Sequence, residues 1–211
     1  MHAETLIYDF DPLCGWCFAF GPSFRAAAAA NPDLPVALRY GGLVVGARVG
    51  PIAEHRGYLL AGFERVRQVA GFGPEAPFLE GLLAEGTYVS DSEPPCRAIF
   101  VMEQIAPAGA FGFAAALPDL HYREGVPLDD VAALAELAAA NGADPALFAA
   151  RWRSPEARAG VQAAFARHRA AGAVSYPTLR YRRGDQDALV AQGFATPDET
   201  VRRIGSLRSL G

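Results

Sequence analysis

Short apolar runs rich in β-branched and aromatic residues occur near the start of the chain. Residues 5–10 (TLIYDF) form such a run, which predicts a buried strand ending before Asp11-Pro12, because proline ends a strand and restricts the preceding residue. A helix is predicted from near Cys14 to about Ala30, kinked by the internal Pro22. Residues 36–45 (VALRYGGLVV) predict a second strand, weakened by its two central glycines.

From residue 51 to residue 172 the pattern is helical. Residues 53–70 repeat their apolar side chains at close to helical spacing, at Tyr58, Leu59, Phe63, Val66 and Val69. Residues 94–105 and 128–140 have a similar pattern. Asp144-Pro145 and Ser154-Pro155 each place a capping residue before a proline at the first helical position, so further helices are expected there, the last one ending at Gly172.

The strand pattern returns near the C-terminus. Residues 178–181 (TLRY) and 188–192 (ALVAQ) predict two strands joined by a turn at residues 182–185. Thr196-Pro197 begins a final helix that reaches about Leu207. The order β-α-β, helical block, β-β-α predicts an α/β fold in which residues 1–50 and 173–211 share one sheet. Residues 51–172 then form an inserted helical domain.

Composition and charge exclude several classes of protein. The 211 residues are 51% hydrophobic and 20% charged, as in a globular domain. The net charge of −4 provides no basic surface for nucleic acid. Acidic residues interrupt the first apolar run, and the most apolar window, residues 98–117, contains Glu103 and Pro107. We therefore expect neither a secretory signal nor a membrane span, and hence a reducing cytoplasm. Three cysteines there do not suggest structural disulfides.

The candidate chemistry lies in Cys14-Gly15-Trp16-Cys17, directly after the first strand and at the start of a helix. Unpaired N–H groups and the helix dipole stabilise a thiolate at that position. We predict that Cys14 is the exposed nucleophile. Cys17, one turn further on, is predicted to be the buried thiol that resolves a mixed disulfide.

Other interpretations of this cysteine pair stay open. A zinc site needs about four ligands, and only Cys96 and four isolated histidines remain, so redox chemistry is favoured over zinc and no metal is expected. The spacing can also arise by chance in a core. A third alternative is a redox-switched binding or chaperone module, which would need an exposed apolar patch, with Trp16, Phe18 and Phe20 as the candidates.

With Ser175-Tyr176-Pro177-Thr178 ahead of a later strand, the CGWC motif and the long helical insertion resemble the DsbA family, in particular its FrnE-like branch. The resemblance covers essentially the whole chain. It implies a thioredoxin fold with a helical domain inserted after the second strand, and a cis Pro177 packed against the cysteine sulfurs.

The resemblance also implies a motif and substrate groove made by Gly15, Trp16, Tyr176, Pro177 and Thr178. The chain departs from the family in two places. The dipeptide between the cysteines is Gly-Trp, and Tyr176 is bulkier than the residue usual before the proline.

Several further residues have two interpretations. Asp9 and Asp11 lie beside the motif, where a buried carboxylate could relay the proton of the resolving thiol, but for Asp11 a role in capping or turning the chain is favoured. Cys96 could be a third redox thiol, although a lone cysteine on an amphipathic helix is more often a small buried hydrophobe. We interpret His121 and His168 as surface or packing residues.

The favoured function is a thiol–disulfide oxidoreductase that exchanges with protein or small-molecule thiols, glutathione included, and uses no cofactor beyond the Cys14–Cys17 disulfide. An extended substrate could pair with the backbone of Tyr176. Whether it acts as oxidase, reductase or isomerase stays open, as do its electron partner and oligomeric state. The enzyme alternative is a glutathione-dependent transferase or isomerase of the kappa type. It would require a glutathione site beside Pro177 and a small-molecule pocket under the helical domain.

Overall fold

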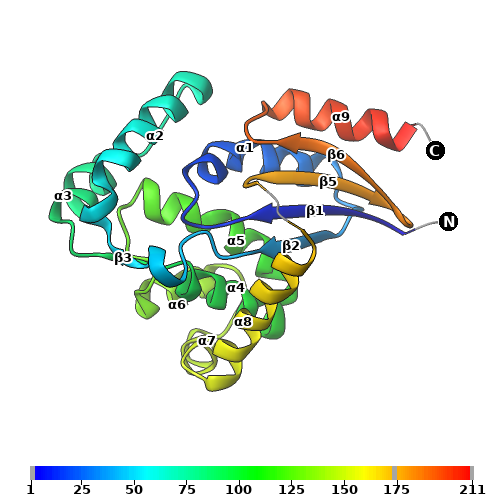
Figure 1. Ribbon diagram of the computed structural model, residues 1–211. Coiled ribbons are helices and arrows are strands. Elements are labelled where there is room, and N and C mark those ends of the chain that lie inside the picture. The colour runs from blue at the N-terminus through cyan, green and yellow to red at the C-terminus, as the bar shows by residue number, and fades with distance from the viewer. Residues whose placement is uncertain (1–2, 173–174, 210–211) are drawn as a thin grey trace.

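The computed structural model describes residues 3–172 and 175–209 and contains a four-stranded sheet built from both ends of the chain (Figure 1). The strands lie in the order β2-β1-β5-β6. Their bounds are Glu4–Phe10 for β1, Val36–Tyr40 for β2, Thr178–Arg183 for β5 and Gln186–Gln192 for β6. β1 pairs parallel with β2 and antiparallel with β5, and β5 pairs antiparallel with β6. The predicted closure of both ends into one sheet is confirmed.

Two helices complete this part of the fold: α1 (Gly15–Ala30) and α9 (Pro197–Ser209), which pack against each other. Side chains alternate between the two faces of a strand, so Leu6, Tyr8 and Phe10 of β1 share one face. Tyr8 stacks on Phe10 and on Phe24 of α1, with ring centroids 4.8 and 3.9 Å apart. This aromatic stack fixes α1, and with it the CGWC motif, against the central strand.

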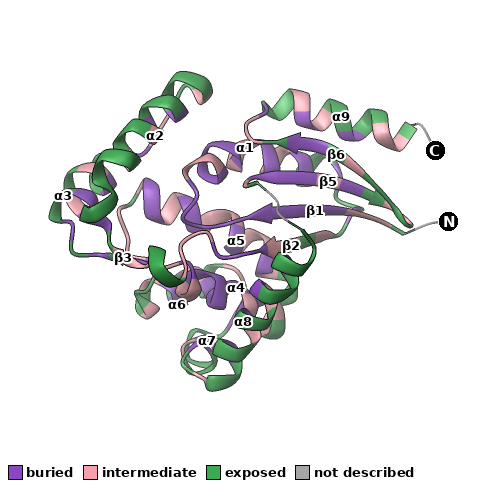
Figure 2. Cartoon of the chain, in the orientation of Figure 1, coloured by how far each residue is buried: buried purple, intermediate pink, exposed green. Residues whose placement is uncertain are grey.

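The segment between β2 and β5 is mainly helical, as predicted, and buries its own apolar faces (Figure 2). It also contains a short two-stranded sheet, which the sequence pattern did not predict. In this segment η1 and η2 are short 3-10 helices and η3 is a π-helix. The elements of the whole segment are η1 (Gly46–Arg48), β3 (Gly50–Pro51), η2 (Ile52–His55), α2 (Arg56–Ala70), η3 (Pro77–Leu82), α3 (Leu83–Glu85), β4 (Val89–Ser90), α4 (Glu93–Ile105), α5 (Pro107–Tyr122), α6 (Val131–Ala140), α7 (Pro145–Trp152) and α8 (Pro155–Ala170).

Side-chain caps begin three of these helices. The side chains of Asp130, Asp144 and Ser154 accept hydrogen bonds from the first-turn N–H groups of α6, α7 and α8. The predicted starts at Pro145 and Pro155 are thereby confirmed. The domain boundaries at residues 50/51 and 172/173 stay predictions, and residues 173–174 lie outside the described residues.

Two sequence predictions about strand ends are wrong. The strand predicted over residues 36–45 ends at Tyr40. Gly42 has a φ of 73°, which breaks the strand, and a side chain at Gly41 would collide with the Tyr176 hydroxyl. The turn predicted over residues 182–185 is shorter, because Arg182 and Arg183 still pair with β6.

The helix predicted over residues 53–70 begins at Arg56 and is less buried than its pattern implies. Phe63 and Val66 are buried, but Tyr58 and Val69 are 80% and 55% exposed. Figure 1 shows the reason, since α2 extends away from the sheet and is covered on one side only. Within the described residues, no helix combines the length and apolar character needed to cross a bilayer.

Candidate active site

Cys14 occupies the N-cap of α1, and Cys17 lies in the first turn of that helix. The Cys14 sulfur accepts a hydrogen bond from the backbone N–H of Cys17, at 3.4 Å. Cys14 lies in the wall of a cavity, whereas Cys17 lies behind it and is 2% exposed. The two cysteines are close and are not bonded to each other in the structure.

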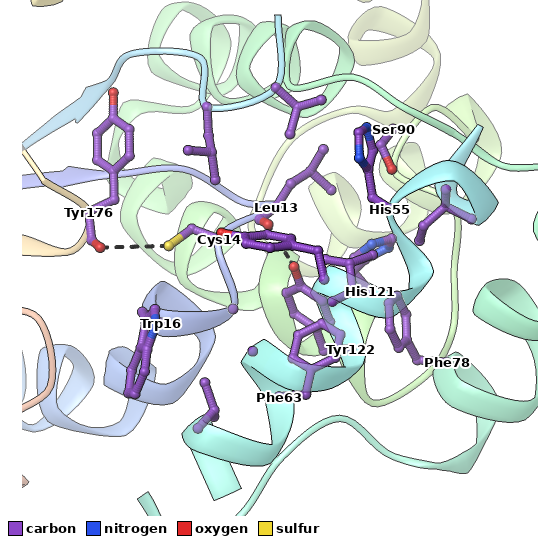
Figure 3. Close-up of a pocket in the computed structure, with 18 of the residues that line it drawn as sticks. Leu13, Cys14, Trp16, His55, Phe63, Phe78, Ser90, His121, Tyr122 and Tyr176 are labelled. Atoms are coloured by element: carbon purple, nitrogen blue, oxygen red, sulfur yellow. Dashed lines mark hydrogen bonds between the residues drawn. The ribbon is translucent and has the colours of Figure 1, made fainter. Parts of the chain in front are cut away.

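Cys14 is less open than predicted. Only 6% of the Cys14 surface is exposed to solvent, so the prediction that Cys14 is an exposed residue is wrong. The cause is tertiary, because Tyr176 approaches from another part of the chain and the insertion covers the remaining side (Figure 3). The sulfur is reached through the cavity.

The segment Ser175–Thr178 faces the motif. The Cys14 thiol donates to the carbonyl oxygen of Tyr176, with 3.8 Å between sulfur and oxygen (Figure 3). The Tyr176–Pro177 peptide bond is cis. The Thr178 hydroxyl donates to the Ser175 carbonyl, and the Pro177 carbonyl accepts from Gly193 N–H, so neighbouring backbone holds both ends of this segment.

Gly15 and Trp16 have different surroundings. A Cβ atom on Gly15 would lie 2.9 Å from the ring of Phe63, so glycine lets α2 pack closely onto the start of α1. Trp16 is half-buried and lines the cavity. Phe18 and Phe20, candidates for an exposed apolar patch, are buried at 1% and 0% exposure, so that part of the chaperone alternative is wrong.

Asp11 is a fully buried connector. Its carboxylate accepts hydrogen bonds from Leu13 N–H, Leu43 N–H and the Ser92 hydroxyl, which ties the loops after β1 and β2 to the start of α4. Burial raises the pKa of Asp11 in spite of these bonds. Burial, the proximity of Cys14 and the charge of Asp11 raise the pKa of the Cys17 thiol well above its usual range.

Asp9 lies on the opposite face of β1 from Tyr8 and has different partners. Arg180 donates to its carboxylate at 2.6 Å, and Arg39 Nε and His168 Nε2 lie 3.2 and 3.3 Å from it. His168 Nδ1 in turn lies 3.5 Å from the Tyr176 hydroxyl. Asp9 therefore joins three strands and α8 to the residue before Pro177.

Sequence reasoning missed Tyr8. Tyr8 lies in the same buried cluster as Cys14 and Cys17, and burial together with these two cysteines raises the pKa of its hydroxyl well above the usual range. The alternation of Leu6, Tyr8 and Phe10, which directs Tyr8 toward α1, is the signal that could have found it. Cys96 is fully buried in the main core, and burial raises the pKa of its thiol, as expected for a packing residue.

His121 and His168 are both buried, so the interpretation as packing residues holds and the surface alternative is wrong. His121 Nδ1 lies 2.9 Å from the Val126 carbonyl oxygen. A carbonyl only accepts, so the proton sits on Nδ1 and the neutral ring presents an acceptor at Nε2. Burial lowers the pKa of His121 to about 4.

Because His121 is buried and its pKa is lowered, we expect the folded protein to lose stability in mild acid. The unfolded chain binds the His121 proton near pH 6.5 and the folded chain only near pH 4, so protonation favours unfolding between these values. The free energy of unfolding should fall by about 3 kcal/mol across that interval because of this group. Urea unfolding of wild type and His121→Phe at several pH values measures it.

In His121→Phe the stability lost between pH 6.5 and pH 4 should be smaller than in wild type. His55→Gln, at an exposed histidine on the same cavity, is the matched control and should keep the wild-type slope. Equal slopes in all three proteins would show that His121 titrates alike in the folded and unfolded states.

Comparisons with known proteins give a result only at the level of structure. No protein-family model matches the sequence, and the search of curated proteins gives no significant match. Among solved structures, the chain is similar to the cytosolic disulfide reductase DsbM from Pseudomonas aeruginosa, with 29% identity, a TM-score of 0.85 and coverage of 98% of this chain and 100% of that one.

Two further solved structures extend this comparison. The complex of DsbM with GSH has 27% identity, a TM-score of 0.79 and coverage of 97% and 99%. Reduced DsbA1 from Neisseria meningitidis has 13% identity, a TM-score of 0.54 and coverage of 99% and 83%, and shows the fold alone. The fold is thus the thioredoxin fold with a helical insertion, and the similarity extends over nearly the whole chain.

Proposed function

Because this chain is a DsbA-like protein of the thioredoxin superfamily, we propose that it is a thiol–disulfide oxidoreductase working through Cys14 and Cys17. The observation that carries this proposal is the position of the two sulfurs. Cys14 caps α1 at the wall of a cavity, and Cys17 lies directly behind it in the same helical turn. A substrate can reach the first sulfur, and only the second can reach the resulting mixed disulfide.

The exchange proceeds in two displacements. The Cys14 thiolate attacks one sulfur of a substrate disulfide, forms a mixed disulfide and releases the other sulfur as a thiolate. The Cys17 thiolate then attacks the Cys14 sulfur, which forms the Cys14–Cys17 disulfide and releases the second half of the substrate. Two electrons pass from the dithiol to the substrate, and the reverse sequence oxidises a substrate dithiol.

The second displacement requires Cys17 to lose a proton in a buried place. Asp11 is suited to accept it, because its charge acts on the Cys17 thiol and its own pKa is raised by burial. Asp9 is engaged by two arginines on the other face of β1, so we do not assign the relay to Asp9. Tyr8 shares the buried surroundings of Cys17, and we assign it a role as a positioning residue.

The substrate class follows from the segment facing Cys14. The backbone of Tyr176 lies beside the sulfur, where an extended substrate can pair with it through main-chain hydrogen bonds. We propose protein and low-molecular-weight thiols as partners, glutathione among them, since the DsbM structure is described with GSH. DsbM is also described as a cytosolic reductase, which supports a reductase direction and a cytoplasmic location for this chain.

One observation favours a second candidate function. The cavity beside Cys14 has the size and position that a glutathione-dependent transferase or isomerase of the kappa type would need for a small organic substrate. The two cysteines favour dithiol exchange, because a transferase does not require the resolving Cys17. Turnover that survives Cys17→Ala would support the transferase.

The proposed function is tested by the reduction potential of the Cys14–Cys17 pair. The purified protein is equilibrated in glutathione redox buffers, and insulin reduction is measured on the same sample. We expect a reversible two-electron transition that is lost in Cys17→Ala. Failure to form an intramolecular disulfide under oxidising buffers, together with no insulin reduction, would contradict the proposal.

A further inference from the structure

A cavity of about 450 Å³ opens beside the Cys14 sulfur (Figure 3). It lies between the start of α1 and three elements of the insertion, namely α2, η3 and α5. Its walls are mainly aromatic and aliphatic, and include Trp16, Phe63, Val66 and Phe78. This volume lies within the roughly 300–1,000 Å³ that small-molecule sites occupy. A reactive sulfur therefore lies in the wall of an apolar space of small-molecule size.

Tyr122 and His121, two buried polar side chains that line this space, are uncharged. Tyr122 donates its hydroxyl to the Leu13 carbonyl at 2.7 Å, so that group is already satisfied (Figure 3). His121 is neutral, because its pKa is lowered to about 4 and Nδ1 bonds to Val126. The guanidinium of Arg48 and the imidazole of His55 also line the cavity, and both belong to exposed residues. An uncharged body therefore matches the interior better than an ionic one does.

One glycine keeps part of this space open. Gly62 lines the cavity from α2, and a Cβ atom built on it would meet no atom within 4 Å. Glycine in a helix interior costs about 0.5–1 kcal/mol relative to alanine. At this position a larger residue would occupy cavity volume without colliding with the fold.

We propose that the cavity binds the aromatic or branched aliphatic body of a low-molecular-weight organic disulfide, with the substrate sulfur against Cys14. This inference rests on the proposed thiol–disulfide exchange and names its substrate class. The Cys14 thiolate attacks the disulfide R–S–S–R and releases one RS⁻. Cys17 then displaces the second RS⁻ and closes the Cys14–Cys17 disulfide. Two molecules of a monothiol such as glutathione reduce that disulfide and leave as their own disulfide.

The test fills the cavity from α2. Gly62→Leu is compared with Gly57→Leu, which lies on the same helix, is exposed, does not line the cavity and also has nothing within 4 Å of an added Cβ. The substrates are 4,4′-dithiodipyridine, which is aromatic, and bis(2-hydroxyethyl) disulfide, which is small and hydrophilic. The reduced protein is mixed with each disulfide in the absence of glutathione, because glutathione reduces 4,4′-dithiodipyridine directly, and insulin reduction is measured in parallel.

We expect the second-order rate constant of the reduced protein with the aromatic disulfide to fall at least about tenfold in Gly62→Leu, the scale of a pocket contact, while that with the hydrophilic disulfide changes less than about twofold. Gly57→Leu should match wild type with both. An unchanged aromatic rate in Gly62→Leu overturns the inference. A loss of insulin reduction as large as the aromatic loss also overturns it, because the space is then a groove for protein side chains.

A second measurement separates this inference from the proposed function. Thioanisole, which has an aromatic body but no disulfide to exchange, is titrated into Cys14→Ser while tryptophan fluorescence is recorded, since Trp16 lines the cavity. Saturable quenching that is lost when Gly62→Leu is added supports the site even if all disulfide assays fail. Quenching that persists in the double variant places the ligand elsewhere and overturns the proposal.

Discussion

Cys17→Ser should stop the protein at the mixed disulfide. Cys14 can still attack a substrate, but no thiol remains behind it to release the product, so turnover should fall by at least about 10³-fold, as expected when part of a nucleophilic unit is lost. The trapped adduct should contain one substrate moiety per protein, attached to Cys14. Mass spectrometry of the intact protein and of its peptides, without reduction, measures both the adduct and its position.

Two controls accompany this variant. Cys14→Ser should form no adduct at all, because Cys17 is shielded and its pKa is raised by burial. Cys96→Ser should keep wild-type turnover and form no trapped species, since Cys96 is fully buried in the core. An adduct on Cys17 in Cys14→Ser would reverse the assigned roles of nucleophile and resolving thiol.

Asp9→Ala should be strongly destabilising. The carboxylate is fully buried and is shared by Arg180, Arg39 and His168, so its removal leaves these groups without their partner. Breaking a buried ion pair from one side costs about 3–5 kcal/mol. We expect about 3 kcal/mol, because both arginines remain partly exposed. Urea unfolding measures the change.

A matched control is Asp187→Ala, which removes the partner of Arg182 from an exposed pair on β5 and β6. An exposed pair contributes about 0–1 kcal/mol, so this variant should stay close to wild type. Equal effects of the two substitutions would show that the Asp9 network has no special role. In the surviving folded fraction of Asp9→Ala, KM should rise more than kcat falls, since His168 supports Tyr176 beside the substrate.

Features that depend on neighbouring residues were predictable from the sequence. Three such features are the buried run of β1, the capping residues before Pro145 and Pro155, and the cysteine pair after a strand. In each case the residues that determine the structure lie within a few positions of one another in the chain. The order of these patterns then required two chain ends in one sheet. The CGWC and SYPTL segments resemble those of the DsbA family, and this resemblance added the expectation that Pro177 faces the cysteines.

Only the tertiary structure decided what surrounds the sulfurs. The cavity is formed by residues from α1, α2, η3 and α5, which are far apart in sequence, and no local pattern specifies that their side chains leave a space. The same is true of Tyr8 against Cys17 and of Asp9 against His168. Position 41 has no room for a side chain because the Tyr176 hydroxyl, from a residue more than 130 positions later in the sequence, lies against Gly41. Burial, pairing and empty volume are properties of long-range packing, whereas periodicity and capping act within one or two turns of chain.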